Sequence, residues 1–303
     1  DREVYLKNKH VYEKICFKVS EALNDYITSI LNDTNFQITL NNNYDVLYKN
    51  LKIASVYKGE SPLRPKLFIS NNQFINDVKY NNLKNKIEIK LFQIVNSAFW
   101  EESIYDVINN KNLKAIIFSL HENLGIIRVS NVFTFYSNLK SPELVFLKNK
   151  NILINNNHIY YEKILKGYKN KTRWFLSNLF FNNNKNINIP SEAVFLNKQN
   201  LNALILNSIG YIKLKKFAVK ISFIDKFYKK FLSEKKNVYY FNFYHKRKLK
   251  VSFLAIYEIL DYLDFTKVAG TNMISYWIIK KHSISKKKVY DKNSPFYILN
   301  KLQ

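Results

Sequence analysis

The glycines of this chain exclude two of the commonest nucleotide-binding folds. Only five glycines occur in the sequence, at positions 59, 125, 167, 210 and 270, and no two of them lie close together. A dinucleotide-binding loop and a P-loop both need glycines clustered within a few residues, because the backbone must approach the phosphates closely. We therefore expect neither motif. No repeat with a period of about 20–50 residues is visible, which argues against a solenoid.

Metal-binding and disulfide-rich classes are also disfavoured. Cys16 is the only cysteine, so the chain can form no internal disulfide and no cysteine-rich zinc site. The five histidines lack the paired spacing of zinc ligands. The spacing of Asp77 with Glu88 and Lys90 resembles a nuclease metal site, but it is more typical of a charged helix surface. We expect no metal and no cofactor. The apolar runs are also shorter than the ~18 residues of a membrane span.

The pattern of apolar residues predicts an α+β fold of mixed helices and antiparallel hairpins, in one large domain or two closely packed domains. Apolar residues recur every three or four positions over 11–31, which predicts an amphipathic helix. Further helices are expected over 73–100, from Ser191 to Leu206, over 223–232 and over 254–265. Hairpins are expected over 115–129, 143–154 and 238–253, with a turn or loop of defined shape over 59–65. We interpret 1–303 as a single α+β unit, with a weak boundary near 181–190.

The charge balance points to a polyanionic partner. Lys and Arg number 48 against 23 Asp and Glu, which gives a formal net charge of +25. Such an excess is self-repulsive in the folded state, and a polyanion relieves that repulsion. RNA fits best, followed by an anionic membrane surface and then a negatively charged protein. A genome rich in A+T codons explains part of the lysine excess, but it does not explain the scarcity of acidic residues.

The residue types also allow RNA cleavage without a metal. The 2′-hydroxyl is an internal nucleophile, so an enzyme must supply a base, an acid and cations for the phosphorane charge. A histidine titrates near pH 6.5 and can take either proton-transfer role. His282 lies among lysines such as Lys281, a cation for phosphate charge, and Glu60 lies four residues before Arg64. The ordinary interpretations are a solvated basic tail and a surface ion pair.

Two basic clusters are expected to contact RNA phosphates. The first is the turn of the basic hairpin, made of His245, Lys246, Arg247 and Lys248, and the second is the run Lys286, Lys287 and Lys288. Aromatic residues fill much of 239–244, directly before the first cluster. Some of these rings could stack on bases, although at a period of two half of them should lie in the core.

Taken together, these features resemble the toxin subunits of yeast linear-plasmid killer systems, which are secreted tRNA anticodon nucleases. The shared features are the A+T-driven composition, a start at Asp1 as though processed, a single cysteine, strong basicity, and a Glu and a His far apart in sequence. The resemblance covers the length and general character of the chain, without an aligned motif. It implies metal-independent transesterification to a 2′,3′-cyclic phosphate. Glu60 and His282 would be the catalytic pair, and Arg64 would stabilise the phosphate charge.

The resemblance also implies partners and a location. A chitin-binding carrier subunit, tethered through Cys16, would deliver the toxin. The chain would be secreted as a monomeric subunit and would act on tRNA in the cytoplasm of the target cell. Burial of the Cys16 thiol beside the apolar stripe of the 11–31 helix is the plainer interpretation of this residue.

Two other interpretations stay open. An organelle-encoded ribosomal protein, located in the mitochondrial matrix, would bind rRNA without catalysis, and it explains the basicity with no catalytic residue. An accessory subunit of an organellar respiratory complex is the third interpretation. A chain that is stable alone as a monomer argues for the nuclease, and a chain that is stable only within an assembly argues for the ribosomal protein.

Overall fold

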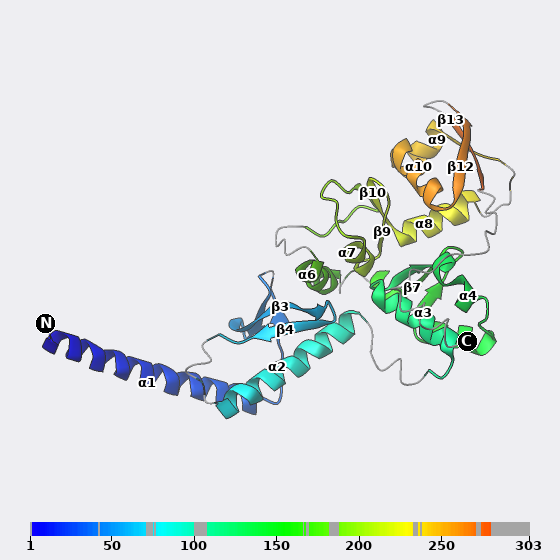
Figure 1. Cartoon of the computed structure of the whole chain (residues 1–303). Coiled ribbons are helices and arrows are strands. Elements are labelled where there is room, and N and C mark those ends of the chain that lie inside the picture. Colours follow the sequence, from blue (N-terminus) through cyan, green and yellow to red (C-terminus); the bar gives the residue numbers. More distant parts are fainter. Residues whose placement is uncertain are drawn as a thin grey trace. The chain divides into compact units, whose positions relative to one another are not determined.

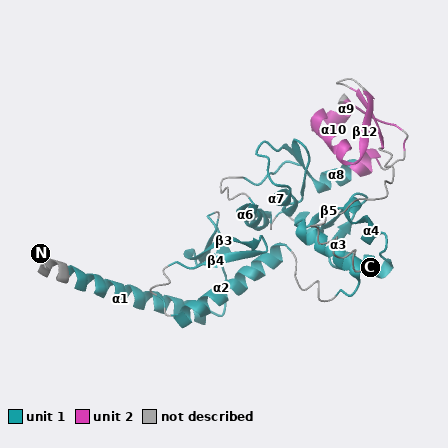
Figure 2. Ribbon diagram, viewed as in Figure 1, with its two compact units in different colours: residues 1–227 teal, residues 228–303 magenta. Residues whose placement is uncertain are grey.

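The chain divides into two compact units, residues 1–227 and residues 228–303 (Figure 2). The computed structural model describes residues 2–41, 43–70, 75, 77–99, 108–165, 167, 170–181, 188–232, 236, 238–270 and 274–279. The division falls between Phe227 and Tyr228, whereas the sequence placed a weak boundary near 181–190, of which 182–187 lie outside these ranges. Each unit has its own sheets and buried core.

The predicted α+β class is confirmed. Helices and small sheets follow one another along the chain (Figure 1), and every strand pair among the described residues is antiparallel. The first elements are α1 (Arg2–Asn32), β1 (Thr39–Leu40), β2 (Asp45–Tyr48), β3 (Leu51–Ser61), β4 (Arg64–Phe68) and α2 (Asp77–Ala98). The strands form a sheet in the order β1-β2-β3-β4.

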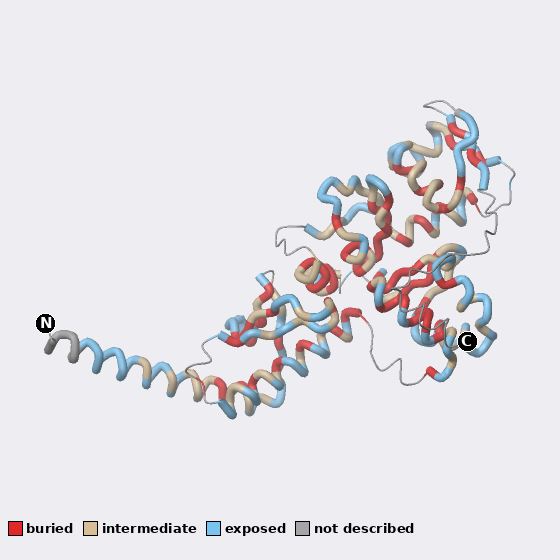
Figure 3. The backbone as a smooth tube through the Cα atoms, viewed as in Figure 1, coloured by how far each residue is buried: buried red, intermediate tan, exposed pale blue. Residues whose placement is uncertain are grey.

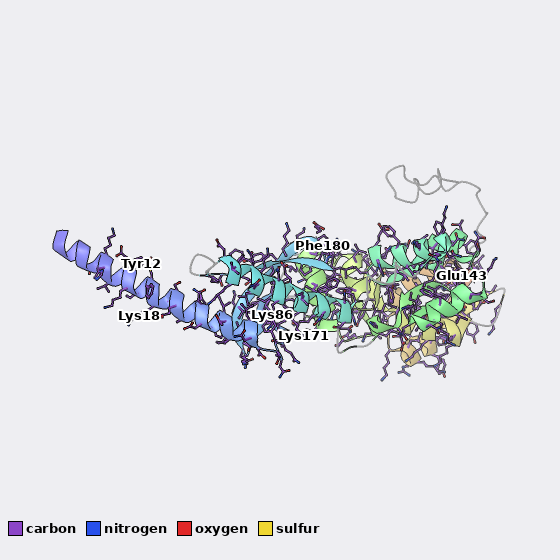
Figure 4. The ribbon with its side chains drawn as sticks, turned by 90° about the horizontal axis from the view of Figure 1, so that it is seen from below. Tyr12, Lys18, Lys86, Glu143, Lys171 and Phe180 are labelled. Atoms are coloured by element: carbon purple, nitrogen blue, oxygen red, sulfur yellow. The ribbon has the colours of Figure 1, made fainter. Side chains whose placement is uncertain are left out.

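The C-terminal end of α1 is anchored on α2, where Ile27 and Ile30 are buried. Lys86 of α2 caps this end, because its Nζ donates to the carbonyl oxygens of Ile30, Leu31 and Asp33 at 2.8–2.9 Å (Figure 4). A helix leaves its last carbonyls without intrahelical partners and is negative at that end, so an ammonium group is well placed there. The helix predicted over 11–31 is therefore confirmed and is held at one end.

The N-terminal half of α1 is largely exposed to solvent (Figure 3), and this includes the apolar residues that recur every three or four positions along the helix. The exposed fractions of Tyr12, Ile15 and Val19 are 67%, 55% and 48%. Figure 4 shows Tyr12 and Lys18 projecting from this half of the helix. Cys16 is a free, half-buried thiol on the same half. The stripe is continuous in sequence but is buried only near its C-terminal end.

The turn or loop of defined shape predicted over 59–65 is a tight turn that joins strands β3 and β4. The strands continue to a tight turn at 62–63, with Ser61 paired to Arg64. A Cβ at Gly59 would overlap the carbonyl oxygen of Arg64, so the close approach of the two strands requires glycine at this position. Of the two prolines, Pro62 lies in this turn and Pro65 lies in β4.

The next part of the first unit replaces two predicted hairpins with helices. Its elements are α3 (Lys111–Glu122), β5 (Ile126–Arg128), η3 (Val129–Val132), α4 (Phe133–Tyr136), α5 (Ser141–Asn149), β6 (Ile152–Ile154), β7 (His158–Tyr161) and η4 (Glu162–Leu165). Asn110 Oδ1 accepts hydrogen bonds from the N–H groups of Asn112 and Leu113 and so starts α3. The strands pair in the order β5-β7-β6. Segments 115–120 and 143–147 are therefore helical, and the hairpins predicted over 115–129 and 143–154 are wrong.

The last part of the first unit packs around Trp174. Its elements are α6 (Asn170–Phe181), β8 (Val194–Leu196), α7 (Ala203–Ser208), β9 (Tyr211–Lys213), β10 (Phe217–Lys220) and α8 (Ile221–Phe227), with the sheet order β8-β10-β9. Ile205, Leu206 and Tyr211 are buried with Trp174 in one cluster. The helix predicted from Ser191 to Leu206 is wrong over its first part, because β8 pairs with β10 and Asn202 caps only the short α7.

The second unit places one helix against a three-stranded sheet. Its elements are the π-helix η6 (Tyr228–Leu232), β11 (Tyr239–Asn242), α9 (Phe243–Leu249), α10 (Phe253–Tyr262), β12 (Phe265–Gly270) and β13 (Ile274–Ile279). The strand order is β11-β13-β12. Residues buried on the inner face include Tyr239, Phe241 and Trp277, and the Trp277 ring lies 5.3 Å from that of Tyr257 on α10. Helix α10 confirms the helix predicted over 254–265, although it ends earlier.

Candidate nucleic-acid interface

The basic residues 245–248 lie on helix α9, and the hairpin predicted for them is wrong. Asn242 starts the helix, because its side-chain Oδ1 accepts a hydrogen bond from the backbone N–H of His245 at 3.3 Å. In return, the backbone N–H of Asn242 donates to Nδ1 of His245 at 3.2 Å. This reciprocal cap satisfies donors at the start of the helix. The helix ends at Lys250, which adopts a left-handed φ of 54°. Local capping therefore gives this polar run a helical structure.

His245 lies among aromatic rings of the second unit. Its ring centroid is 5.4–5.8 Å from those of Phe231, Tyr240, Phe241 and Tyr244. Partial burial, and then the positive charge of Lys248, lower the pKa of His245. The neutral imidazole is therefore favoured near pH 7, and cationic contacts to phosphate are left to the residues that follow it.

The positive charge of α9 is carried by Lys246, Arg247 and Lys248. Arg247 and Lys248 are exposed, and Nζ of Lys248 donates to the hydroxyl of the exposed Tyr244 at 3.3 Å. The sequence 228–303 contains 16 Lys and Arg against 5 Asp and Glu, a net charge of +11 of the total +25. About a quarter of the chain thus carries nearly half of its net charge, and α9 presents a compact part of it.

On the outer face of the sheet β11-β13-β12, the side chains of the central strand β13 are apolar or aromatic and partly exposed. Tyr240 and Tyr276 are directly opposite each other in the register of β11 and β13, and their exposed fractions are 59% and 43%. On β13, Ile274 and Ile278 share this face with Tyr276, with exposed fractions of 41% and 38%. The alternation expected for 239–244 is therefore observed, since Tyr239 and Phe241 lie in the core.

The residues Glu60 and Arg64 lie together at the exposed end of the β3–β4 hairpin. Glu60 is the penultimate residue of β3, and Arg64 is the first residue of β4. Both side chains are exposed, and Ser61 is the register partner of Arg64. Because Ser61 rather than Glu60 pairs with Arg64, strand alternation directs the Glu60 and Arg64 side chains to opposite faces of the hairpin.

Other predicted site residues lie outside the described residues. These are His282, Lys281, Lys286, Lys287 and Lys288. The pairing of Glu60 with His282 therefore stays a prediction. Cys16 lies on the exposed half of α1, where a hydrogen bond with its thiol raises the pKa of Tyr12. The predicted carrier subunit at this residue likewise stays a prediction.

Two histidines of the first unit are buried, which the sequence analysis did not predict. His121 of α3 lies 2.9 Å from the Tyr161 hydroxyl through its Nε2, and burial lowers its pKa to about 3. His158 of β7 has no exposed surface, and burial followed by the charge of Arg128 lowers its pKa to about 4. Both rings are therefore neutral parts of the core. Their apolar sequence neighbours were the available signal for burial.

A hollow of about 400 Å³ lies beside β8 and is lined by residues between Asn188 and Leu201. Its ionisable side chains are those of Glu192 and Lys198, and its lining contains no histidine. The carbonyl oxygens of Pro190 and Glu192 accept hydrogen bonds from the Tyr211 hydroxyl. This hollow therefore offers less for RNA chemistry than the basic helix and aromatic face of the second unit.

None of the helices in the described ranges is both long enough and apolar enough to cross a membrane. Across the same part of the chain, no three His, Cys, Asp or Glu side chains gather as metal ligands would. No family model, curated protein or solved structure matches this chain. Any functional conclusion must therefore come from the residues and their arrangement.

Proposed function

We propose that this chain binds RNA as a basic, non-catalytic component of an RNA–protein assembly, as a ribosomal protein does. The observation that carries the proposal is the concentration of charge in the second unit, where α9 presents three consecutive basic residues beside exposed tyrosines. Lysine and arginine on one helix form an electrostatic footprint for phosphates. The function requires no catalytic residue.

The exposed stripe of α1 supports a place within an assembly. A soluble monomer rarely leaves a continuous apolar surface in water, and such surfaces commonly mark a contact with another molecule. Tyr12, Ile15 and Phe17 are more than half exposed on this helix.

A metal-independent ribonuclease is the second candidate, and the β3–β4 hairpin is the observation that favours it. Glu60 and Arg64 both lie exposed within two residues of the turn of this hairpin. A carboxylate can take a proton from the 2′-hydroxyl while a guanidinium stabilises charge on the phosphate. In this assignment His282, which can take either proton-transfer role, would protonate the leaving 5′-oxygen. The reaction would proceed in excess EDTA because no step uses a metal.

The first test compares two sets of three lysine or arginine changes. Lys246→Gln, Arg247→Gln and Lys248→Gln together are expected to weaken binding of the full chain to total tRNA by about tenfold or more. A plot of the logarithm of the binding constant against the logarithm of the salt concentration has a negative slope, and the magnitude of that slope should decrease by about 2. Each lost phosphate contact removes roughly 0.7–0.9 from it. Fluorescence anisotropy over a salt series measures both quantities.

The matched control removes the same charge from α1 through Lys9→Gln, Lys14→Gln and Lys18→Gln. These three side chains are exposed on the first unit, and the control should lose clearly less affinity. Equal losses in both sets would mean that net charge alone drives binding, which contradicts an interface at α9.

The same incubations in excess EDTA separate the two candidates. We expect intact tRNA under the proposed function. Discrete fragments ending in a 2′,3′-cyclic phosphate, formed by the wild type and lost in Glu60→Gln, would instead establish the ribonuclease. Lys58→Gln is the control for that variant, because Lys58 is also exposed on β3.

A further inference from the structure

The sheet of the second unit has one face in the core and one face in solvent. Helix α10 packs on the side of Trp277, and the opposite side presents Tyr240, Tyr276, Ile274 and Ile278. An antiparallel sheet with one solvated face usually alternates apolar and polar residues along its strands. Here both sides of the central strand β13 are apolar, since Ser275 is the only polar residue of Ile274–Ile279 apart from the tyrosine hydroxyl. The outer face therefore suits a ligand with apolar surfaces.

We infer that this outer face binds unpaired RNA bases by stacking them on Tyr240 and Tyr276. The inference rests on the proposed RNA-binding function and assigns it a substrate class, single-stranded segments. The two tyrosines are direct register partners, so their Cβ atoms are roughly 5 Å apart on the same face. Two neighbouring rings present a platform for successive bases, and stacking of this kind tolerates any base sequence.

Charge complementarity selects RNA among the molecules that could cover this face. The second unit carries a net charge of +11 in its sequence, so a second copy would bring two strongly positive surfaces together. The ring of Tyr240 lies 5.7 Å from that of His245, which places the face next to the basic helix α9. Bases on the tyrosines would therefore leave their phosphates near the cations of α9.

The geometry also predicts selectivity against duplex RNA. Bases in a duplex are already stacked and paired, and their faces are unavailable to protein side chains. A duplex can still contact the cations of α9 through its phosphates. The tyrosine face should thus contribute to binding of single strands and contribute little to binding of duplexes.

The test uses the full chain with two labelled probes, a 12-nucleotide oligo(U) and a 20-base-pair RNA duplex. Tyr240→Leu and Tyr276→Leu are each expected to raise the Kd for oligo(U) about tenfold, and the double variant about 100-fold. The Kd for the duplex should change less than about twofold. Tyr240→Phe and Tyr276→Phe should bind oligo(U) like the wild type, because stacking needs the ring and not the hydroxyl.

Tyr57→Leu is the matched control, since Tyr57 is a 54% exposed strand tyrosine of the first unit. It should leave both Kd values unchanged. Unchanged oligo(U) binding by the double leucine variant would overturn the inference while the proposed function stands. An equal increase in Kd for the duplex and for oligo(U) would also overturn the inference. A double variant that changes from dimer to monomer without losing RNA affinity would do the same. A wild-type chain that binds neither probe would overturn the proposed function as well.

Crosslinking of the wild type keeps the inference testable even for a leucine variant that misfolds. An oligo(U) containing 4-thiouridine, irradiated with the wild-type chain, should crosslink to peptides containing Tyr240 or Tyr276. Crosslinks confined to the first unit would contradict the assignment.

Discussion

Arg173→Leu is expected to lower the free energy of unfolding of the first unit by about 3 kcal/mol or more. Arg173 has no exposed surface, although arginine is rarely buried so completely. Its Nη1 donates to the carbonyl oxygen of Ala98 at 2.8 Å, and its Nη2 donates to that of Ile164 at 3.4 Å and to Asn170 Oδ1. Leucine would leave these buried acceptors without this donor.

The position of Ala98 adds to the effect of Arg173. Ala98 is the last residue of α2, where the helix is negative and has carbonyl groups without intrahelical partners. The guanidinium on α6 thus stabilises the end of α2 and also binds η4. One buried cation connects α6 and the preceding η4 with α2, whose last residue lies 75 positions before Arg173, so its loss should loosen all three elements.

Urea unfolding followed by tryptophan fluorescence measures this prediction, since the buried Trp174 is the neighbour of Arg173. Lys171→Leu is the control, because Lys171 is exposed on the same helix (Figure 4). It should change stability by less than about 0.5 kcal/mol. The prediction would be contradicted by an Arg173→Leu variant whose free energy of unfolding lies within about 1 kcal/mol of the wild-type value, because losing a hydrogen bond to a charged group costs more than this.

The second large effect is a loss of stability in mild acid. The folded-state pKa values of His121 and His158 are lowered to about 3 and about 4. The unfolded chain takes up protons on both rings below about pH 6.5, while the folded chain does not. The stabilisation is therefore complete above that pH and is lost as the pH falls toward the folded-state values. At pH 5 the loss is about 2 kcal/mol for each histidine.

Urea midpoints between pH 7.5 and pH 5 measure this loss. His121→Gln keeps an amide beside the Tyr161 hydroxyl but removes the titrating ring, so its stability should depend less steeply on pH, by up to about 1.4 kcal/mol per pH unit. His10→Gln is the control on the exposed half of α1, and it should show the wild-type dependence. A His121→Gln variant with the same dependence as the wild type would rule out His121 as a source.

Apolar patterning predicted helices α1 and α10, which both form where they were expected. The hairpin predicted over 115–129 failed because strand propensity does not reveal the pairing partner. Ile126–Arg128 pairs with His158–Tyr161, about thirty residues later. The φ of Leu124, at 48°, turns the chain at the end of α3 in a way that the sequence did not indicate.

The candidate interface was predictable in part. The basic residues of α9 and the alternation of Tyr239 and Tyr240 can be read from the sequence. The pairing of Tyr240 with Tyr276 depends on the register of two strands that are more than thirty residues apart. The burial of Arg173 could not be read from the sequence, because arginine is normally exposed and backbone carbonyl acceptors such as those of Ala98 and Ile164 leave no sequence signal.

The capped end of α1 has a mechanical consequence. Between Tyr12 and Ile30 the helix rises about 1.5 Å per residue, so the exposed stripe is held about 27 Å from the end fixed by Lys86. Each residue also turns the helix by about 100°. The length of the helix between these positions therefore fixes both the distance of the exposed stripe from the anchored end and the direction in which the stripe faces. Deleting one residue between these positions would shorten the reach only slightly, yet it would aim the stripe about a quarter-turn away.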